Sequence, residues 1–321
     1  MKIAFVGKGG SGKTTLSSLF ARHIAAAGRT VVAIDADINQ HLGVALGLAD
    51  DVAEGLPAMG GHLTEIKEYL RGDNLRIPSA AQMVKTTPPG RGSRLLRPCG
   101  DDPLHARLAR DVGGVSLMAT GPFSEDDLGV ACYHSKVGAV ELYLNLLVDA
   151  PDEYVVVDMT AGADSFASGL FTRFDLTFLV AEPTRKGIGV YRQYRDYAAD
   201  HAVPIAVVGN KVTGPADVEF LTDQVPGGPL VCFEHSAAVR ALEQGRPFGL
   251  EDLEDANRTA LARLKDAVDA REPNWPKFGR QAVEFHVKNA RAWANSAAGA
   301  DLTSQVDPEF VFGPATVGAR E

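Results

Sequence analysis

Residues 7–15 read GKGGSGKTT, and they follow a short apolar run and precede a helical pattern that begins at Lys13. The stretch fits the pattern G-x-x-x-x-G-K-[ST], whose last two positions are Lys13 and Thr14. Glycines at such a turn allow positive φ, so that backbone N–H groups point at phosphate oxygens, and the positive end of the following helix adds to that field. The stretch therefore predicts a phosphate-binding loop. The alternative, a glycine-rich turn that only connects strand and helix, does not account for the full motif.

The loop also indicates its ligand. Lys13 is expected to reach the β- and γ-phosphates of ATP, and the Thr14 hydroxyl is expected to ligate Mg²⁺. The predicted cofactors are therefore ATP or ADP together with Mg²⁺. Further contacts with the nucleotide are expected from the rest of the loop, namely Gly9, Gly10, Ser11, Gly12 and Thr15.

Short apolar runs alternate with helical patterns along the chain, which is typical of a parallel sheet covered by helices. Because the runs are almost continuously apolar, the strands are expected to be buried on both faces. The sequence thus predicts an α/β fold, a doubly wound and mostly parallel sheet of seven or eight strands with helices on both faces. The predicted strands are residues 2–6, 31–35, 115–119, 154–158, 176–181, 205–210 and 230–233. The predicted helices are residues 13–27, 137–147, 189–201, 216–224, 236–244 and 253–270.

Two stretches interrupt this alternation. Residues 50–114 are too long for a simple connection, so we expect an insertion in an ATPase domain that spans residues 1–272. The centre of the insertion, residues 85–98, is rich in Pro, Gly and Arg and predicts an exposed, irregular, partly basic loop. Residues 273–321 are expected to form a C-terminal extension, with an amphipathic helix over 277–296 and a loosely ordered tail from residue 299.

Composition limits the possible classes of protein. The 321 residues carry a formal net charge of −9, which argues against a nucleic-acid binder with a basic surface all round but leaves a local basic patch open. Cys99, Cys132 and Cys232 are odd in number and form no CxxC pair, so a reducing compartment fits better than a disulfide framework. The first apolar run is too short for a signal peptide, and the expected location is the cytoplasm.

Lys8 distinguishes this loop from an ordinary phosphate-binding loop. With this second lysine, residues 8–15 have the form KGGxGKTT, which resembles the deviant Walker A loop of the MinD/ParA/ArsA class of P-loop ATPases. In that class the extra lysine reaches across a dimer interface to the phosphates bound by the partner subunit. The resemblance implies this catalytic role for Lys8, beside Lys13, and it implies a homodimer that forms with ATP. The alternative is a solvated loop lysine.

Aspartates end two of the predicted strands. Residues 35–37 read DAD and resemble the first switch of the class, where a carboxylate orients or deprotonates the attacking water. Asp37 is the better match for that catalytic role, although one of the two carboxylates could instead only cap the next segment. Residues 158–162 read DMTAG and resemble the second switch, DxxAG. The resemblance implies that Asp158 holds the magnesium ion and that Gly162 contacts the γ-phosphate side; an ordinary N-cap is the alternative for this aspartate.

Later segments resemble elements that surround the base. Asn210 and Lys211 end a strand where the class places an Asn that reads the adenine, and an amide offers both a donor and an acceptor to that base. Residues 182–184, EPT, resemble an E-P-[ST] turn of relatives, and residues 236–247 resemble the A…GxP element near the base. The resemblance covers about residues 1–270.

Within the class, residues 33–37, 182–184 and 208–212 look most like the CooC branch, which assists nickel insertion into carbon monoxide dehydrogenase. That branch carries a Cys-x-Cys motif, whereas the matching segment here has Cys132 and His134. Doubled by a two-fold axis, these residues would supply two thiolates and two imidazoles, which suit a tetrahedral Zn²⁺ or Ni²⁺ site at a dimer interface. The alternative is a buried cysteine and a hydrogen-bonded histidine without metal.

Together these features predict a dimerising Mg-ATP switch that hydrolyses ATP to ADP and phosphate and acts on an unidentified protein client. Two further roles stay open: a metallochaperone of the CooC type, and a positioning or partitioning protein that binds membrane, DNA or protein in its ATP state. For such a contact the candidates are the helix at 277–296, for which packing on the ATPase body is favoured, and a basic stretch that is otherwise a solvated loop. The basic stretch consists of Lys85, Arg91, Arg94 and Arg97.

Overall fold

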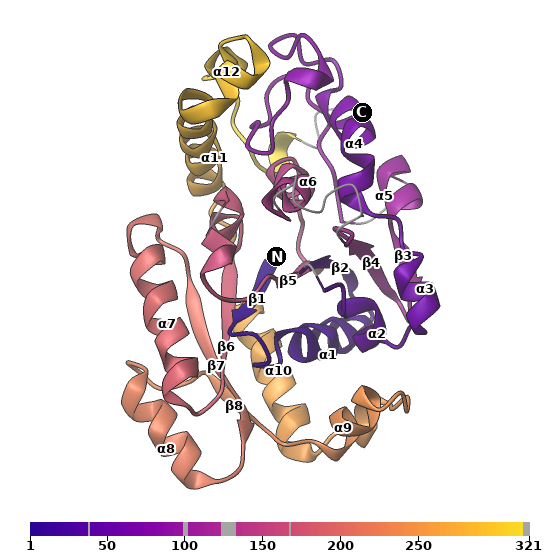
Figure 1. The fold of residues 1–321 in the computed structure, drawn as a ribbon, viewed down its shortest axis with the longest axis vertical. Coiled ribbons are helices and arrows are strands. Elements are labelled where there is room, and N and C mark those ends of the chain that lie inside the picture. Colours follow the sequence, from indigo (N-terminus) through magenta and orange to yellow (C-terminus); the bar gives the residue numbers. More distant parts are fainter. Residues whose placement is uncertain (38, 99–101, 123–132, 167, 317–321) are drawn as a thin grey trace.

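The computed structural model describes residues 1–37, 39–98, 102–122, 133–166 and 168–316. Within them, one eight-stranded sheet has the order β3-β4-β2-β5-β1-β6-β7-β8, and all neighbouring strands are parallel except β3 and β4. The predicted mostly parallel α/β sheet is therefore confirmed. The strands are β1 (Lys2–Gly7), β2 (Thr30–Ala36), β3 (Arg110–Val112), β4 (Val115–Ala119), β5 (Glu153–Met159), β6 (Leu176–Ala181), β7 (Ile205–Val212) and β8 (Val231–Glu234) (Figure 1).

Helices cover both faces of the sheet. α1 (Lys13–Ala26) and α10 (Asp255–Asp269) pack on one face, and α4 (Leu63–Arg71), α6 (Tyr133–Asn145) and α7 (Arg185–Ala198) pack on the other (Figure 1). The remaining helices are α2 (Leu42–Leu46), α3 (Asp50–Glu54), α5 (Pro103–Leu108), α8 (Pro215–Gln224), α9 (Ala237–Glu243), α11 (Trp275–Asn289) and α12 (Asn295–Ala298).

The strand β1 shows why the sheet forms here. Its side chains alternate between the two faces, and all six residues are buried, so both faces of the strand contribute to the core. On the α1 face, the ring of Phe5 lies 5.8 Å from Phe20 and 5.2 Å from Phe178. Because the strands next to β1 run parallel to it, their carboxyl ends meet at one edge, and the phosphate-binding loop lies at that edge.

The insertion at residues 50–114 is packed against the domain, which corrects the expected exposed loop. It contains α3, α4, α5 and the short strand β3, none of which was predicted. Residues 85–98 are irregular, as expected, but Thr86 and Thr87 are at most 1% exposed and Leu96 is fully buried. The arginines of the basic stretch have partners within the chain: Arg91 pairs with Asp307, Arg97 pairs with Glu153, and Arg94 lies over the ring of Tyr69. The three arginines therefore connect elements of the fold, while Arg91 and Arg94 stay exposed to solvent.

The helix α11 packs at the amino ends of the strands. Phe278 is 3% exposed, and the ring of Trp275 lies 4.4 Å from the Lys2 ammonium group at the start of β1. Lys2 also pairs with the buried carboxylate of Asp149. These contacts agree with the interpretation that this helix packs on the ATPase body.

The segment after α12 is packed as far as residue 316, which corrects the loosely ordered tail expected from residue 299. Leu302 is 1% exposed, and its carbonyl oxygen lies 2.8 Å from Nε2 of the buried His286. Asp307, 6% exposed, accepts a 2.9 Å hydrogen bond from Arg91 in the insertion. The tail and the insertion therefore stabilise each other, which composition could not reveal because the partners are far apart in sequence.

Candidate functional site

The phosphate-binding loop joins β1 to α1, and its backbone conformation depends on glycine. Gly10 and Gly12 have φ of 78° and 94°, which lie in the left-handed region. A Cβ atom on Gly12 would lie 2.2 Å from Nδ2 of Asn210, so this position admits no side chain unless Asn210 moves. Lys13, the first residue of α1, is 6% exposed. The loop thus has the predicted order of strand, glycine turn and helix.

The Thr14 hydroxyl and the Asp158 carboxylate, predicted as magnesium ligands, lie side by side. Thr14 Oγ1 donates a 2.6 Å hydrogen bond to Asp158 Oδ2. The other oxygen, Oδ1, is buried without a hydrogen-bond partner among the described residues. Burial raises the pKa of Asp158 to about 7, although the nearby Lys13 ammonium opposes the rise. A hydroxyl beside a buried carboxylate with an unused oxygen is a donor set that suits Mg²⁺.

The first switch contains two carboxylates with different surroundings. Asp35 is 2% exposed, and its oxygens accept hydrogen bonds from the backbone N–H of Asp37 at 3.1 Å and of Leu42 at 2.8 Å. Burial and the neighbouring Asp158 raise the pKa of Asp35 well above its ordinary value. Asp37 is half-buried and lines the cavity at the loop, where its Oδ1 accepts hydrogen bonds from the backbone and side chain of Asn39, each 3.1 Å long. Asp35 therefore caps the segment, and Asp37 is the carboxylate that faces the cavity.

The second switch lies against the loop. A Cβ atom on Gly9 would be 3.9 Å from the Cβ of Ala161, and Gly162 has φ of 69°. The structure thus brings the two predicted segments together at the ends of β1 and β5, although they are about 150 residues apart in sequence.

A carboxylate to which the sequence analysis gave no role lies beside the phosphate-binding loop. Glu182, after β6, pairs with Lys8 at 3.0 Å through one oxygen and with Lys211 at 3.0 Å through the other. Lys211 also donates a 2.6 Å hydrogen bond to the carbonyl oxygen of Gly10. Burial raises the pKa of Glu182, but the hydrogen bonds from the two lysines outweigh it, so the pKa lies below its ordinary value. The E-P-T turn was the only sequence signal for this residue.

Asn210 is directed toward the loop. Its Nδ2 donates a 2.7 Å hydrogen bond to the carbonyl oxygen of Ser11, and the side chain borders the cavity. Reading of an adenine by this amide stays a prediction.

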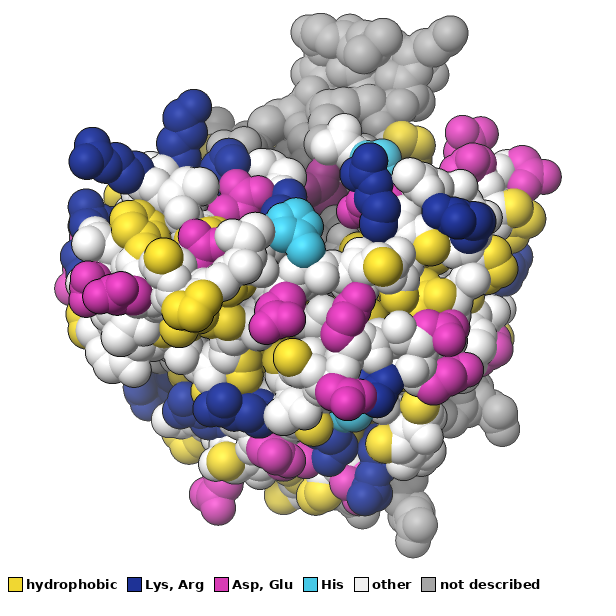
Figure 2. Space-filling model, turned by 90° about the horizontal axis from the view of Figure 1, so that it is seen from below, with side chains coloured by type: hydrophobic (Ala, Val, Ile, Leu, Met, Phe, Trp, Pro, Cys, Tyr) yellow, Lys and Arg dark blue, Asp and Glu magenta, His cyan; other side chains and the backbone are white. Residues whose placement is uncertain are grey.

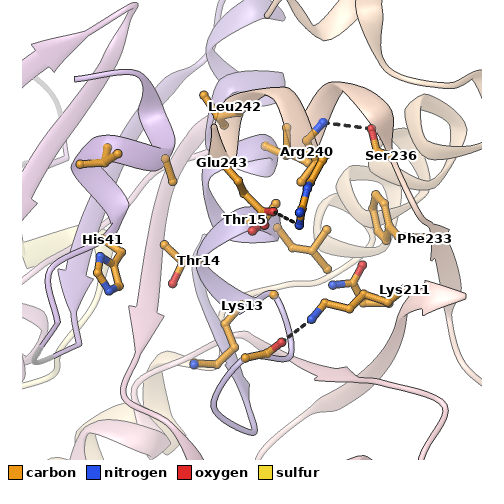
Figure 3. A pocket seen from close by; sticks show the side chains of 18 of the residues that line it. Lys13, Thr14, Thr15, His41, Lys211, Phe233, Ser236, Arg240, Leu242 and Glu243 are labelled. Atoms are coloured by element: carbon orange, nitrogen blue, oxygen red, sulfur yellow. Dashed lines mark hydrogen bonds and ion pairs between the residues drawn. The ribbon is translucent and has the colours of Figure 1, made fainter. Parts of the chain in front are cut away.

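A cavity of 820 Å³ opens beside the loop and has the size of a small-molecule site. Figure 3 shows α1 in its middle, with Thr14 and Thr15 facing the space, His41 on one side, and Arg240 and Glu243 of α9 on the other. Part of its apolar wall comes from the predicted base element and its neighbours, which contribute Phe233, Val239, Leu242 and Leu253, and α1 adds Leu16 and Leu19.

The proposed transition-metal pair cannot be placed. Cys132 lies outside the described residues, and of His134 only the backbone, in the first turn of α6, is described. Among the residues that the structure does describe, no group of three or more His, Cys, Asp or Glu side chains is arranged to hold a metal ion.

The surface gives no sign of an extended nucleic-acid or membrane contact on the face seen in Figure 2. Acidic and basic side chains are interspersed there, and no large area has a single sign of charge. No helix in the described ranges is both long and apolar enough to cross a bilayer.

The fold and this site define a nucleotide-binding P-loop protein of the deviant Walker A type. Residues 3–248 match the family model "CobQ/CobB/MinD/ParA nucleotide binding domain", and the chain belongs to this family. The prediction of MinD/ParA kinship is thereby confirmed.

Individual relatives differ in what they are named for. The chain is 28% identical over 271 residues to the carbon monoxide dehydrogenase accessory protein CooC of Rhodospirillum rubrum. This alignment covers 84% of this chain and 96% of that protein. It is 29% identical over 226 residues to an uncharacterized ATP-binding protein of Methanocaldococcus jannaschii, which covers 70% of this chain and 79% of that protein. The septum site-determining protein MinD of Pyrococcus horikoshii, solved with Mg-ADP, has a TM-score of 0.54 at 15% identity and covers 84% of this chain and 96% of that one. The last likeness shows the fold alone.

Proposed function

We propose that this chain is a Mg-ATP-dependent switch ATPase that dimerises when it binds ATP, hydrolyses it to ADP and phosphate, and uses the cycle to act on a protein client. The observation that carries the proposal is the paired arrangement at the loop. Thr14 and the unused, buried oxygen of Asp158 lie together beneath the loop, whereas the side chain of Lys8 is 37% exposed at the surface. The ATPase domain is taken as residues 1–272, and residues 273–321 form an extension of it.

Each residue of the site has a distinct part in the proposed reaction. Lys13 neutralises charge on the β- and γ-phosphates, while Thr14 and Asp158 hold the magnesium ion. Mg²⁺, when bound, would neutralise phosphate charge in the transition state. Asp37, whose carboxylate lines the cavity and accepts hydrogen bonds from Asn39, orients the attacking water.

Lys8 distinguishes a dimerising switch from an ATPase that works as a monomer. Its side chain is 37% exposed and its ammonium group pairs with Glu182 beside the loop, so it is the lysine that we assign to the second subunit. In the proposed ATP-bound dimer, Lys8 of each subunit binds the phosphates held by the other.

The test is to separate nucleotide binding from dimerisation. Lys13→Ala is expected to weaken binding of a fluorescent ATP analogue more than a hundredfold, since it removes the main charge on the phosphates. Lys8→Ala is expected to leave that binding within about threefold of the wild type, while sedimentation velocity with ATP shows monomers and phosphate release slows. Lys265→Ala, which removes a lysine paired with Asp269 on α10, is the control and should change neither. A Lys8→Ala protein that still dimerised with ATP like the wild type would refute the proposal.

A second candidate function is supported by the similarity to CooC over nearly the whole length of that protein. In this case the client is a metalloenzyme, and the chain carries a metal ion at Cys132 and His134 in a dimer. The candidate predicts about one Zn²⁺ or Ni²⁺ per dimer in elemental analysis after metal loading and gel filtration. The metal should be lost in Cys132→Ser and kept in Cys232→Ser, which removes a cysteine of β8 in another part of the chain. Metal-free dimers after loading would exclude it.

A further inference from the structure

The most informative feature outside the predicted site residues is the carboxylate of Glu182. It binds two lysines at once, one oxygen to each: Lys8 is part of the phosphate-binding loop, and Lys211 donates a hydrogen bond to the loop carbonyl of Gly10. The side chain of Glu182 is 17% exposed, whereas those of Lys8 and Lys211 are 37% and 42% exposed. The acceptor is thus the more buried partner, and the donors extend from the surface toward it.

The backbone fixes Glu182 in place. Its carbonyl oxygen accepts a 2.7 Å hydrogen bond from the N–H of Thr184, whose hydroxyl caps α7 by accepting from the N–H of Gly187. A Cβ atom on Gly187 would lie 2.5 Å from that same carbonyl oxygen, so the first turn of α7 packs directly on the backbone of Glu182. Movement at this contact therefore falls to the long lysine side chains.

Lys211 holds the second oxygen by a special backbone conformation. It has φ of 59°, which is unusual for a residue with a side chain, and it lies at an irregularity in the pairing of β7 with β8. This conformation directs its ammonium group to both Glu182 and the carbonyl oxygen of Gly10. Lys211 thus stays with the loop of its own subunit, and Lys8 is the lysine that can leave Glu182 without breaking a contact with the loop backbone.

We propose that Glu182 is a positioning residue that holds Lys8 on its own subunit in the monomer and releases it when the ATP-bound dimer forms. The inference rests on the proposed function, because Lys8 must have a destination on the partner. Glu182 keeps Lys211 throughout, so the loop stays ordered while Lys8 changes from a carboxylate of its own subunit to the phosphates of the other. The pair therefore opposes dimerisation until ATP supplies a stronger acceptor.

The size of the effect follows from exposure. An ion pair between partly exposed groups shifts an equilibrium by about two- to fivefold. Because both subunits release Lys8, removal of the Glu182 charge is expected to lower the dimer dissociation constant by about four- to twenty-five-fold. High salt screens the pair, so the difference from the wild type should shrink between low and high ionic strength.

The experiment measures the dimer dissociation constant by sedimentation velocity with a non-hydrolysable ATP analogue. Glu182→Gln is expected to dimerise more tightly, by the factor above. Glu182→Ala is expected to have the same effect, and it serves as a second variant in case the Gln amide perturbs the turn. Glu219→Gln, on the exposed surface of α8, is the matched control and should behave like the wild type. The gain should persist in a Lys211→Met background, which shows that it arises from Lys8.

Two failures can be told apart by running Lys8→Ala alongside. If Lys8→Ala dimerises like the wild type, the proposed function itself is wrong. If Lys8→Ala is monomeric but Glu182→Gln dimerises no more tightly than the wild type, or less tightly, the role of Glu182 is refuted and the switch stands.

Discussion

Asp158→Asn is expected to stabilise the protein while it removes its magnesium-dependent activity. One pH unit of pKa corresponds to about 1.4 kcal/mol. Raising the pKa of Asp158 from 3.8 to about 7 therefore costs the folded state about 4 kcal/mol at alkaline pH, where the buried carboxylate is charged. The substitution removes this cost, but it places an amide NH₂ group where the oxygen without a partner now lies, and a buried donor without an acceptor costs about 1–3 kcal/mol. The expected net gain is about 1–3 kcal/mol.

The assay is thermal unfolding at pH 8 in EDTA without nucleotide. For a chain of this size the gain corresponds to a rise in Tm of about 2–6 °C. Addition of Mg-ATP should raise the Tm of the wild type but not that of Asp158→Asn, since the variant lacks the charged ligand. A variant with an unchanged or lower Tm in EDTA would refute the reasoning, because burial of an uncompensated charge would then not dominate at this position.

Asp149→Asn provides a control of opposite sign at similar burial. The pKa of Asp149 lies at about 2, because the charges of Lys2 and the amino terminus outweigh the effect of burial. Lowering the pKa from 3.8 to about 2 contributes about 2 kcal/mol of stability, which is present above pH 4 and lost as pH falls through 2. The same substitution should therefore destabilise here. For Asp158 the folded state prefers the proton, so its unfavourable contribution grows as pH rises from 4 to 7, and the variant should lose less stability over this range.

Two further predictions concern the loop and the tail. Gly12→Ala places a Cβ atom 2.2 Å from Asn210 in a left-handed conformation, so binding of a fluorescent ATP analogue should fall at least tenfold; Gly28→Ala, also left-handed at φ of 71° but with nothing within 4 Å, should cost only about 1 kcal/mol of stability and leave binding intact. Normal ATP binding by Gly12→Ala would contradict the close contact. Deletion of residues 299–321 removes the carbonyl partner of the buried His286 and should lower the free energy of unfolding in urea by about 2–5 kcal/mol, whereas an unchanged midpoint would mean that the tail contributes nothing.

The parts of the fold that the sequence predicted are those with local signals. Apolar runs such as residues 154–158 are strands because burial on both faces demands continuous apolar character, and the structure has this strand one residue longer at each end. The glycine loop carries its signal within nine residues. The strand β3 was missed because three residues, Arg110–Val112, are too short for a periodic pattern.

The insertion shows why composition misled. Pro, Gly and Arg are typical of exposed loops, but Arg91 has its carboxylate partner at Asp307, 216 residues later. Arg97 likewise pairs with Glu153 on β5. Only the tertiary structure brings such partners together. Once the arginines are paired, the rest of residues 85–98 can be buried. The same reasoning explains the tail, since neither segment alone contains the partner that orders it.

In the site, the sequence predicts the positions of the carboxylates but not the partners of the lysines. Asp35 and Asp158 lie at strand ends, where the backbone fixes their position, so a motif and its spacing predict where they are. The ammonium group of Lys8 lies at the end of a long, flexible side chain, so the anion that it binds depends on which acceptor is available. The partly exposed pair with Glu182 contributes at most about 1 kcal/mol. Charge-assisted hydrogen bonds to phosphate are stronger, and in the proposed dimer they form at a site that the second subunit closes to water. A resting contact this weak is one that ATP on the partner can replace, and this is why the Lys8–Glu182 pair suits a switch better than a buried ion pair would.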